Sequence, residues 1–289
     1  MTFKDGIKEK LHRDLGFGFY RKDTSPVATF RILAKGSGVL CGMIFVPTII
    51  TLVEEEFFLT PMRERPEDVV AITAHKSDGD EIHAGEVIAT LTGNAEMLLK
   101  AERTICDYLS RLSGIATYTA RRVASVADTR VVLLDTRKQS SIDREENKYA
   151  IRVGGGGNHR AGFFDGILIK DNDIALFGGV TEALSRRLRE AKFLTRTEVE
   201  VRTFDELHEL LGDGRADAIL LDNMSPEFLE TAVTMIRASG KPYLIEASGV
   251  GDYDIAEIAK SGVTHISLSA LVTEGQARKI DISMKIVYV

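Results

Sequence analysis

The sequence has few residues of the kind that would build a disulfide framework or a zinc site. Its 289 residues include only two cysteines, Cys41 and Cys106. Both have apolar neighbours in the sequence, and two thiols supply too few ligands for either construction. We therefore expect both thiols to be reduced and buried.

A surplus of positive charge is also missing. The chain has 37 Lys and Arg residues against 43 Asp and Glu residues, for a formal net charge of -6. A protein that binds nucleic acid normally presents a broadly basic surface. The composition therefore argues against a nucleic-acid partner, and any local cluster of cations is better explained by a small, highly charged ligand.

The chain lacks a segment with the character of a signal peptide or a membrane span. Its first residues are charged from Lys4 onward and contain no apolar core. The uncharged stretch 36–53 includes Gly38, Gly42 and Pro47 and is marginal in length for a span. We interpret this stretch as a strand end, a turn and a core helix, and we expect a cytoplasmic protein without a membrane partner.

Short β-branched runs alternate with helical segments from residue 131 onward. This alternation is typical of parallel strands joined by helices. A Thr, Ser or Asp precedes several of the helical segments, as a capping residue would. The expected strands cover residues 131–134, 166–169, 197–201, 218–221, 243–245 and 265–268, and the expected helices cover 180–192, 204–211, 226–239 and 253–261.

The preceding part of the chain has a different pattern. β-like runs at 27–35 and 86–91 and a helical segment at 95–112 indicate an α+β unit. A chain of 289 residues that is 44% hydrophobic can bury one large core and a smaller one. We predict an incomplete, TIM-like α/β barrel over residues 114–275 and an N-terminal α+β domain over residues 1–113 that residues 276–289 rejoin.

Polar residues recur at the carboxyl ends of the predicted strands. In α/β barrels these ends converge on one rim, which carries the catalytic groups. The residues at these ends are Asp135, Arg137, Lys170, Glu200, Asp222, Glu246, Ser248, Ser267 and Ser269. Randomly placed surface residues would not recur at the same end of six successive strands, so the pattern favours a common site.

Cationic and titratable residues also surround the glycine run at 154–157. They are Arg137, Lys138, Arg152, His159, Arg160 and Lys170. The glycines fit neither the dinucleotide-binding motif nor the P-loop spacing, and they can equally form a plain flexible turn. Lys170 is suited to binding an anion, or to forming a Schiff base as the lysine of a barrel lyase does. A single histidine such as His159 is more often structural than catalytic. The cluster as a whole favours a pocket for a small polyanion.

Ten short motifs extend over nearly the whole chain in a fixed order. They are Ala101-Glu102-Arg103, Ser113-Gly114-Ile115-Ala116-Thr117, Asp135-Thr136-Arg137-Lys138, Lys148-Tyr149-Ala150, Asn158-His159-Arg160, Leu168-Ile169-Lys170-Asp171-Asn172, Glu198-Val199-Glu200-Val201, Leu221-Asp222-Asn223-Met224-Ser225-Pro226, Glu246-Ala247-Ser248-Gly249 and Asp281-Ile282-Ser283-Met284-Lys285. In order and spacing they resemble the quinolinate phosphoribosyltransferases, which are carboxylating nicotinate-nucleotide pyrophosphorylases. Members of this family join quinolinate to 5-phosphoribosyl-1-pyrophosphate (PRPP) with Mg²⁺ and form nicotinate mononucleotide, pyrophosphate and CO2 in NAD biosynthesis.

The resemblance implies a role for each matching residue. Glu200 and Asp222 would act at the ribose and hold Mg²⁺ together with PRPP, and Lys138 and Lys170 would also take part in catalysis. Ser248, Gly249 and Ser269 would bind the phosphate. The acid would be bound by Arg137, Lys138, His159, Arg160 and Lys170, together with Arg103 from the partner subunit of a homodimer or a higher homo-oligomer.

Several positions differ from the family pattern. Residues 139–146 are more acidic and lack a Pro-Gly turn, and Val250 and Ser269 occupy positions of family glycines. Asp173 replaces a histidine, Asp107 an asparagine, and Phe19-Tyr20-Arg21 a differently composed segment. These differences leave open a divergent paralogue that acts on another aromatic carboxylic acid, or a weakly active or non-catalytic ligand-binding protein.

Overall fold

The structure, a computed structural model, describes residues 3–16, 26–57, 69–139, 143–251 and 253–288. Its contacts divide the chain into two compact units. The first unit comprises Met1–Ala120, Ser140–Gly155 and Val272–Val289, and the second comprises Arg121–Gln139 and Gly156–Leu271. The predicted division assigned residues 114–120, 140–155 and 272–275 to the barrel, whereas their contacts group them with the first unit. The segment 17–25, which includes Phe19-Tyr20-Arg21, lies outside the described residues.

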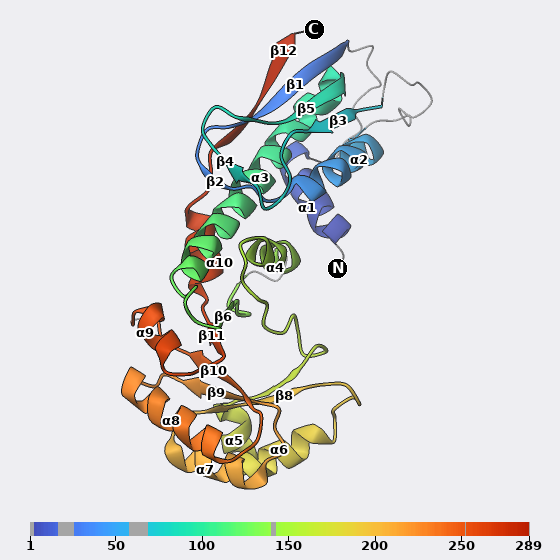
Figure 1. Ribbon diagram of the computed structural model, residues 1–289. Coiled ribbons are helices and arrows are strands. Elements are labelled where there is room, and N and C mark those ends of the chain that lie inside the picture. Colours follow the sequence, from blue (N-terminus) through green and yellow to red (C-terminus); the bar gives the residue numbers. More distant parts are fainter. Residues whose placement is uncertain (1–2, 17–25, 58–68, 140–142, 252, 289) are drawn as a thin grey trace. The chain divides into compact units, whose positions relative to one another are not determined.

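A six-stranded parallel sheet forms the centre of the second unit (Figure 1). Its strands are β6 (Val132–Leu134), β7 (Ile167–Ile169), β8 (Thr197–Val201), β9 (Ala218–Asp222), β10 (Leu244–Ser248) and β11 (His265–Ser267). They are ordered β6-β11-β10-β9-β8-β7, so β6 and β7, which are consecutive in the chain, form the two edges. The second unit is therefore an open, incomplete α/β barrel, as the sequence predicts.

Gly157 lies against the free edge of β6. Its backbone N–H donates a hydrogen bond of 2.7 Å to the carbonyl of Leu133, and it forms a parallel bridge with Leu134. A Cβ atom at this position would lie 2.8 Å from the Leu134 side chain. At Gly154, a Cβ atom would lie 2.5 Å from the backbone carbonyl oxygen of Ala116, so close packing requires a glycine there. The chain beyond Gly157 leads directly to His159 and Arg160.

The predicted helices of the second unit are present. They are α6 (Val180–Leu188), α7 (Phe204–Asp213), α8 (Pro226–Ala238) and α9 (Ile255–Lys260). Two of them, α7 and α8, begin directly after the Thr or Ser that precedes the predicted helix. Thr203 and Glu206 form a capping box at α7, and Ser225 and Asp254 accept backbone N–H groups at the starts of α8 and α9. Helices α6, α7 and α8 lie along one side of the sheet (Figure 1). One further helix, α5 (Asp171–Phe177), follows Lys170 directly.

Apolar and acidic side chains alternate along β8, so one face of the strand belongs to the hydrophobic core of the second unit and the other face to the polar interior of the barrel. Val199 and Val201 are fully buried and belong to the set of aliphatic residues that the helices cover. Glu198 and Glu200 occupy the alternate positions and therefore point to the opposite face of the sheet. The strand thus contributes two carboxylates to the interior of the barrel at two different depths.

An antiparallel sheet forms the centre of the first unit. Its order is β12-β1-β5-β3, with β12 (Ile282–Tyr288), β1 (Val27–Ala34), β5 (Val87–Asn94) and β3 (Ala71–Ala74). The end of the chain therefore completes the sheet of the N-terminal segment. A smaller pair consists of β2 (Gly38–Val39) and β4 (Glu81–Ile82), and a long helix, α3 (Ala95–Ala124), begins directly after β5. Helix α10 (Ala270–Ala277) precedes β12.

The uncharged stretch 36–53 has the predicted structure. It contains β2, the short 3-10 helix η1 (Met43–Phe45) and the first part of α2 (Val46–Phe57), and its apolar side chains Ile49, Leu52 and Val53 are fully buried. Cys41 and Cys106 are free and buried, as expected. Among the described residues, none of the helices combines the length and the apolar character needed to cross a membrane.

A buried polar network attaches α4 (Arg144–Val153) to two other helices of the first unit. Lys10 on α1 (Phe3–Leu15) forms an ion pair with Asp143, which lies at the start of α4. Arg111 on α3 donates a 2.6 Å hydrogen bond to Asn147, and Tyr108 donates one of 3.3 Å to Glu146. This network explains why residues 143–153 group with the first unit, an arrangement that hydrophobic periodicity could not predict.

Candidate active site

Lys170 and Glu200 form an ion pair where β7 and β8 end. The two strands pair in parallel with Ile169 opposite Val199, which brings the residue after β7 beside the end of β8. The Glu200 side chain is buried, whereas the Lys170 side chain is about half exposed. Lys170 therefore compensates a buried carboxylate and also remains accessible to a second anion.

Arg202 connects three carboxylates at the same ends. Its Nη1 lies 2.8 Å from Asp171, its Nη2 lies 3.5 Å from Glu200, and its Nε lies 3.3 Å from Asp222. Glu200 and Asp222 come from the adjacent strands β8 and β9. We refer to Asp171, Glu200, Arg202 and Asp222 as the carboxylate network. It joins predicted site residues from neighbouring strands into one polar surface.

The turn after β10 approaches the end of β9 closely. Asn223 has a left-handed backbone with φ of 56°, and its N–H donates a 2.9 Å hydrogen bond to the carbonyl of Ser248. The Asn223 amide also donates to Asp222 at 2.7 Å. Gly249 has φ of 71°, and a Cβ atom there would lie 2.2 Å from Asn223 Oδ1. Glycine is therefore required at position 249, where the backbone of Ser248 and Gly249 lies beside Asp222.

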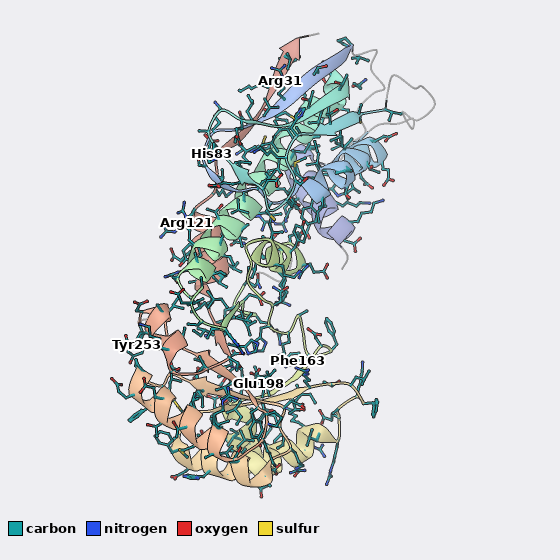
Figure 2. The ribbon with its side chains drawn as sticks, in the orientation of Figure 1. Arg31, His83, Arg121, Phe163, Glu198 and Tyr253 are labelled. Carbon is teal, nitrogen blue, oxygen red and sulfur yellow. The ribbon has the colours of Figure 1, made fainter. Side chains whose placement is uncertain are left out.

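Arg137 and Arg160 both contact the ring of Phe163. The guanidinium carbon of Arg137 lies 4.4 Å from the ring centroid and that of Arg160 lies 5.1 Å from it. Arg160 Nη1 donates a 2.9 Å hydrogen bond to the carbonyl of Gly166. Burial and the charge of Arg137 lower the pKa of Arg160, so the two guanidinium groups are close enough to repel one another. Figure 2 labels Phe163 on the loop that precedes β7.

His159 points toward two carboxylates in the interior of the barrel. Its Nε2 lies 3.1 Å from Glu198 and 3.3 Å from Glu246. Its backbone N–H donates a 2.7 Å hydrogen bond to the buried Asp135, and its Nδ1 accepts one of 2.8 Å from the backbone N–H of Arg160. Both ring nitrogens thus have partners within the protein. This arrangement positions the backbone of Arg160.

The cluster of His159, Glu198 and Glu246 retains an additional proton near neutral pH. Burial opposes the charged ring, but hydrogen bonds to Glu198 and Glu246 outweigh it and raise the pKa of His159 to about 10. Burial and the charge of Glu246 raise the pKa of Glu198. Because Nδ1 accepts a hydrogen bond, Nε2 already carries the single proton of the neutral ring. The additional proton is then held between Nε2 and the carboxylates, as the raised pKa of Glu198 favours. The cluster then has a net charge of minus one instead of minus two.

A cavity of about 170 Å³ opens at the amino ends of the strands. Its lining includes the first residues of five strands, namely Ile167, Thr197, Ala218, Leu244 and His265. Its lining also includes the charged or titratable residues His159, Arg160, Arg196, Glu198 and Glu246. The sequence pattern predicts polar residues at the carboxyl ends of the strands only. It does not predict this cavity, which lies at the amino ends.

The remaining predicted residues lie in both units. Lys138 is exposed after β6, and its backbone N–H donates to Thr136 at 3.1 Å. Ser269 follows β11 and is partly buried, and Val250, which replaces a family glycine, is fully buried. Arg103 is exposed on α3 in the first unit. Lys138, Arg137, Lys170, Glu200, Asp222 and Ser248 all belong to the second unit.

The sequence pattern did not identify Arg202 and Phe163 as members of the site. Arg202 follows β8 and lies two residues beyond Glu200. If the predicted strand had included position 202, alternation would have placed the Arg202 side chain on the same face as Glu200. Phe163 lies in a loop without periodicity, and nothing in the sequence indicates its contacts with two arginines. Glu198, which lies beside Glu200 on the same strand, forms its ion pair with His159.

Two groups of residues have the donor atoms of a metal site. Glu200 and Asp222 offer carboxylate oxygens, the ligand type that Mg²⁺ prefers, and each is contacted by only part of the Arg202 guanidinium. The ligand atoms of His159, Glu198 and Glu246 lie within 4.8 Å of one another. Their separations of 3.1 and 3.3 Å from Nε2 to the carboxylates are hydrogen-bond lengths. The first group therefore fits a hydrated Mg²⁺ that arrives with a phosphorylated substrate.

Fold and site together define an α/β-barrel protein with a second, α+β unit that contains an antiparallel sheet. Lys170 and the carboxylate network lie at the carboxyl ends of the barrel strands, whereas Arg160 lines the cavity at their amino ends. The sequence matches the N-terminal domain of quinolinate phosphoribosyl transferase over residues 14–113 and the C-terminal domain over residues 115–285. The chain belongs to the quinolinate phosphoribosyltransferase family.

Curated relatives and solved structures agree with this assignment. A probable carboxylating nicotinate-nucleotide pyrophosphorylase of Bacillus subtilis is 37% identical over 88% of this chain and 82% of its own length. The enzyme of that name from Mycobacterium leprae is 34% identical over 93% of this chain and 92% of its own. The structure of the nicotinate-nucleotide pyrophosphorylase of Francisella tularensis has a TM-score of 0.82 at 32% identity and covers 99% of this chain and 98% of that one.

Proposed function

We propose that this protein is a decarboxylating quinolinate phosphoribosyltransferase, a pentosyltransferase that makes nicotinate mononucleotide in NAD biosynthesis. Family membership supports this reaction, and the observation that carries it is the carboxylate network with its ion-paired Lys170. That network places the charges that a phosphoribosyl transfer needs on adjacent strand ends. The substrates are quinolinate and PRPP.

Arg137 and Arg160 are proposed to bind the two carboxylates of quinolinate. A planar guanidinium meets a carboxylate with two parallel hydrogen bonds, so two such groups suit a vicinal dicarboxylate. The Nε atoms of both arginines are buried and have no hydrogen-bond partner among the residues that the structure describes. Lys138 and Lys170 would add positive charge for the acid and for the phosphates. His159, whose ring is held by Glu198 and Glu246, would contribute by fixing Arg160.

Glu200 and Asp222 are proposed to act at the ribose. Departure of pyrophosphate from the anomeric carbon gives the sugar oxocarbenium character, and nearby carboxylates stabilise that positive charge. The same two residues would hold Mg²⁺, which offsets the negative charge of the leaving pyrophosphate when it is bound. Arg202 would keep both carboxylates oriented before the substrate arrives. The backbone around Ser248, Gly249 and Ser269 would bind the 5′-phosphate.

Positioning is proposed to supply most of the rate enhancement. The ring nitrogen of quinolinate attacks the anomeric carbon as the bond to pyrophosphate breaks, and the enzyme holds the two centres in line. The ring nitrogen becomes positively charged in the product of this step. The bond to the 2-carboxylate then breaks, its electron pair passes into the cationic ring, CO2 leaves, and a proton replaces it. No covalent bond to the enzyme is needed.

Arg103 of a second copy is proposed to complete the acid site. Arg103 is exposed on α3 of the first unit, and the family resemblance implies that it reaches the site of the partner subunit in a homodimer. An exposed arginine can form a charge-assisted hydrogen bond with a carboxylate without losing an internal partner. The active enzyme would then be a homodimer or a larger homo-oligomer.

Release of pyrophosphate from PRPP is the direct test. The protein is incubated with PRPP, Mg²⁺ and quinolinate, nicotinate or a panel of other aromatic acids, and pyrophosphate and CO2 are measured. Turnover with quinolinate and formation of both products in equal amounts is the expected result. Turnover with another acid alone would identify a divergent paralogue, and no turnover with any acid would contradict the proposed enzyme.

A lysine-dependent lyase is the weaker assignment for Lys170. Schiff-base formation needs an amine that is free to attack a carbonyl carbon, whereas the Lys170 amine is engaged in an ion pair with the buried Glu200. Treatment with a carbonyl substrate and borohydride is expected to leave Lys170 unmodified. A trapped adduct at Lys170 would overturn this conclusion.

A further inference from the structure

Phe163 is an apolar residue with an unusual degree of exposure beside a polar site. Its side chain is 80% exposed, and its neighbour Phe164 is 76% exposed. The loop that carries them is fixed by Asp165, whose carboxylate accepts the backbone N–H of Ala161 at 2.8 Å. A Cβ atom at Gly162 would lie 2.5 Å from the ring of Phe164. The hydrogen bond from Ala161 to Asp165 closes the turn on which Phe163 is exposed.

The Phe163 ring lies within cation–π distance of two guanidinium groups. Both separations, 4.4 Å to Arg137 and 5.1 Å to Arg160, are inside the limit of about 6 Å for this interaction. The two arginines repel each other, as the lowered pKa of Arg160 indicates. The negative faces of an aromatic ring attract both cations, so Phe163 offsets this repulsion.

Few hydrogen bonds from the described residues restrain these arginines. Arg160 Nη1 donates to Gly166, and the Nε atoms of Arg137 and Arg160 are buried with no hydrogen-bond partner in the described part of the chain. An aromatic ring can restrain a guanidinium group without occupying its N–H donors. Contact with Phe163 therefore restrains the two guanidinium groups without using any of their N–H donors.

We infer that Phe163 is a positioning residue that holds Arg137 and Arg160 as a preorganised pair and selects acids with two adjacent carboxylates. The inference rests on the proposed function and adds a specificity determinant to its acid site. A dicarboxylate such as quinolinate uses both guanidinium groups, whereas a monocarboxylate such as nicotinate uses one. Loss of the ring would therefore weaken the dicarboxylate more than the monocarboxylate.

Phe163→Leu and Phe163→Trp test the inference, with Phe164→Leu as the matched control. Leucine preserves much of the apolar bulk and removes the π-system, whereas tryptophan strengthens it. Phe163→Leu is expected to raise the KM and the Kd for quinolinate about fivefold to thirtyfold, as expected from two cation–π contacts. Phe163→Trp and Phe164→Leu are expected to stay within about twofold of the unchanged protein, as is the KM for PRPP in every variant. Binding of nicotinate is expected to change less than binding of quinolinate.

Two measurements decide the inference independently of turnover. In the free protein, ring currents from Phe163 are expected to shift the side-chain N–H resonances of Arg137 and Arg160, and Phe163→Leu is expected to remove these shifts. Binding of benzene-1,2-dicarboxylate is expected to weaken in Phe163→Leu and not in Phe164→Leu. Equal acid binding by the leucine and tryptophan variants, or an absence of ring-current shifts, would overturn the role of Phe163. A failure of pyrophosphate release by the unchanged protein would contradict the proposed function instead.

Discussion

At the residue scale, the acid site depends on guanidinium groups whose donors are not fully used within the protein. Arg202 is the opposite case, because it contacts three carboxylates of the rim. Arg137 and Arg160 keep buried Nε atoms without partners among the described residues. The difference separates an arginine that organises the site from arginines that can bind a ligand.

Replacement of Arg137 by alanine tests this distinction. Arg137→Ala is expected to weaken quinolinate binding by about 1.5–3 kcal/mol, the usual contribution of a hydrogen bond to a charged group. Arg137→Lys is expected to recover part of this loss, because an ammonium supplies charge without the planar fork. Titration calorimetry with quinolinate measures both changes. An unchanged Kd in Arg137→Ala would place the acid elsewhere.

The pKa of His159 predicts a pH-dependent stability. Because the folded pKa of about 10 exceeds the unfolded value of about 6.5, the stabilisation is complete below about pH 6.5 and is lost as the pH rises toward 10. His159→Asn leaves Glu198 and Glu246 without their partner, which is expected to cost about 3–5 kcal/mol near pH 6. Urea unfolding of both proteins at several pH values checks this. The difference in unfolding free energy is expected to shrink above pH 9, and a constant difference would contradict the assignment.

At the element scale, the strands and capped helices of the barrel could be predicted, because alternation and capping residues are local signals. Thr203 and Ser225 cap helices where the sequence indicates, whereas α9 begins after Asp254, two residues later than predicted. Other elements lack such signals. Helix α5 has only seven residues, too few to show a periodic apolar face, and α4 is held by polar contacts that depend on distant residues. In the site, Lys170, Glu200 and Asp222 could be located from strand ends, but the partners of His159 could not, because they come from β8 and β10.

The ion pair at the start of α4 is expected to stabilise the first unit. Lys10 and Asp143 are each about one quarter exposed, so their coupling should lie between that of surface and buried pairs, at about 1–2 kcal/mol. A double-mutant cycle with Lys10→Met and Asp143→Asn, measured by chemical unfolding, gives this coupling. The ion pair and the hydrogen bond with Lys10 lower the pKa of Asp143 against the effect of burial. The coupling is therefore present above the unfolded pKa and is expected to disappear as the pH falls through the folded value.

At the scale of the whole molecule, the residues proposed to bind substrate are divided between the two units. The second unit contains the carboxylate network together with Arg137 and Arg160, which are proposed to bind the acid. The first unit contains Arg103. The order of the sequence motifs was enough to indicate the family across both units, because the motifs extend from Arg103 to Lys285. It could not show that residues 140–155 group with the first unit, because this depends on contacts among three helices.

Mixing two inactive variants tests whether Arg103 acts in the partner subunit. Arg103→Ala and Glu200→Gln are each expected to reduce turnover by at least about tenfold alone, since each removes a charged contact of about 1.5–3 kcal/mol. In a homodimer with shared sites, a mixed dimer has one site with both substitutions and one site with neither. Random assembly makes about half of the dimers mixed, so equal mixing after subunit exchange should restore about one quarter of the unsubstituted activity. If Arg103 acts within its own chain, both sites of every mixed dimer carry a substitution, and activity would stay at the level of the single variants.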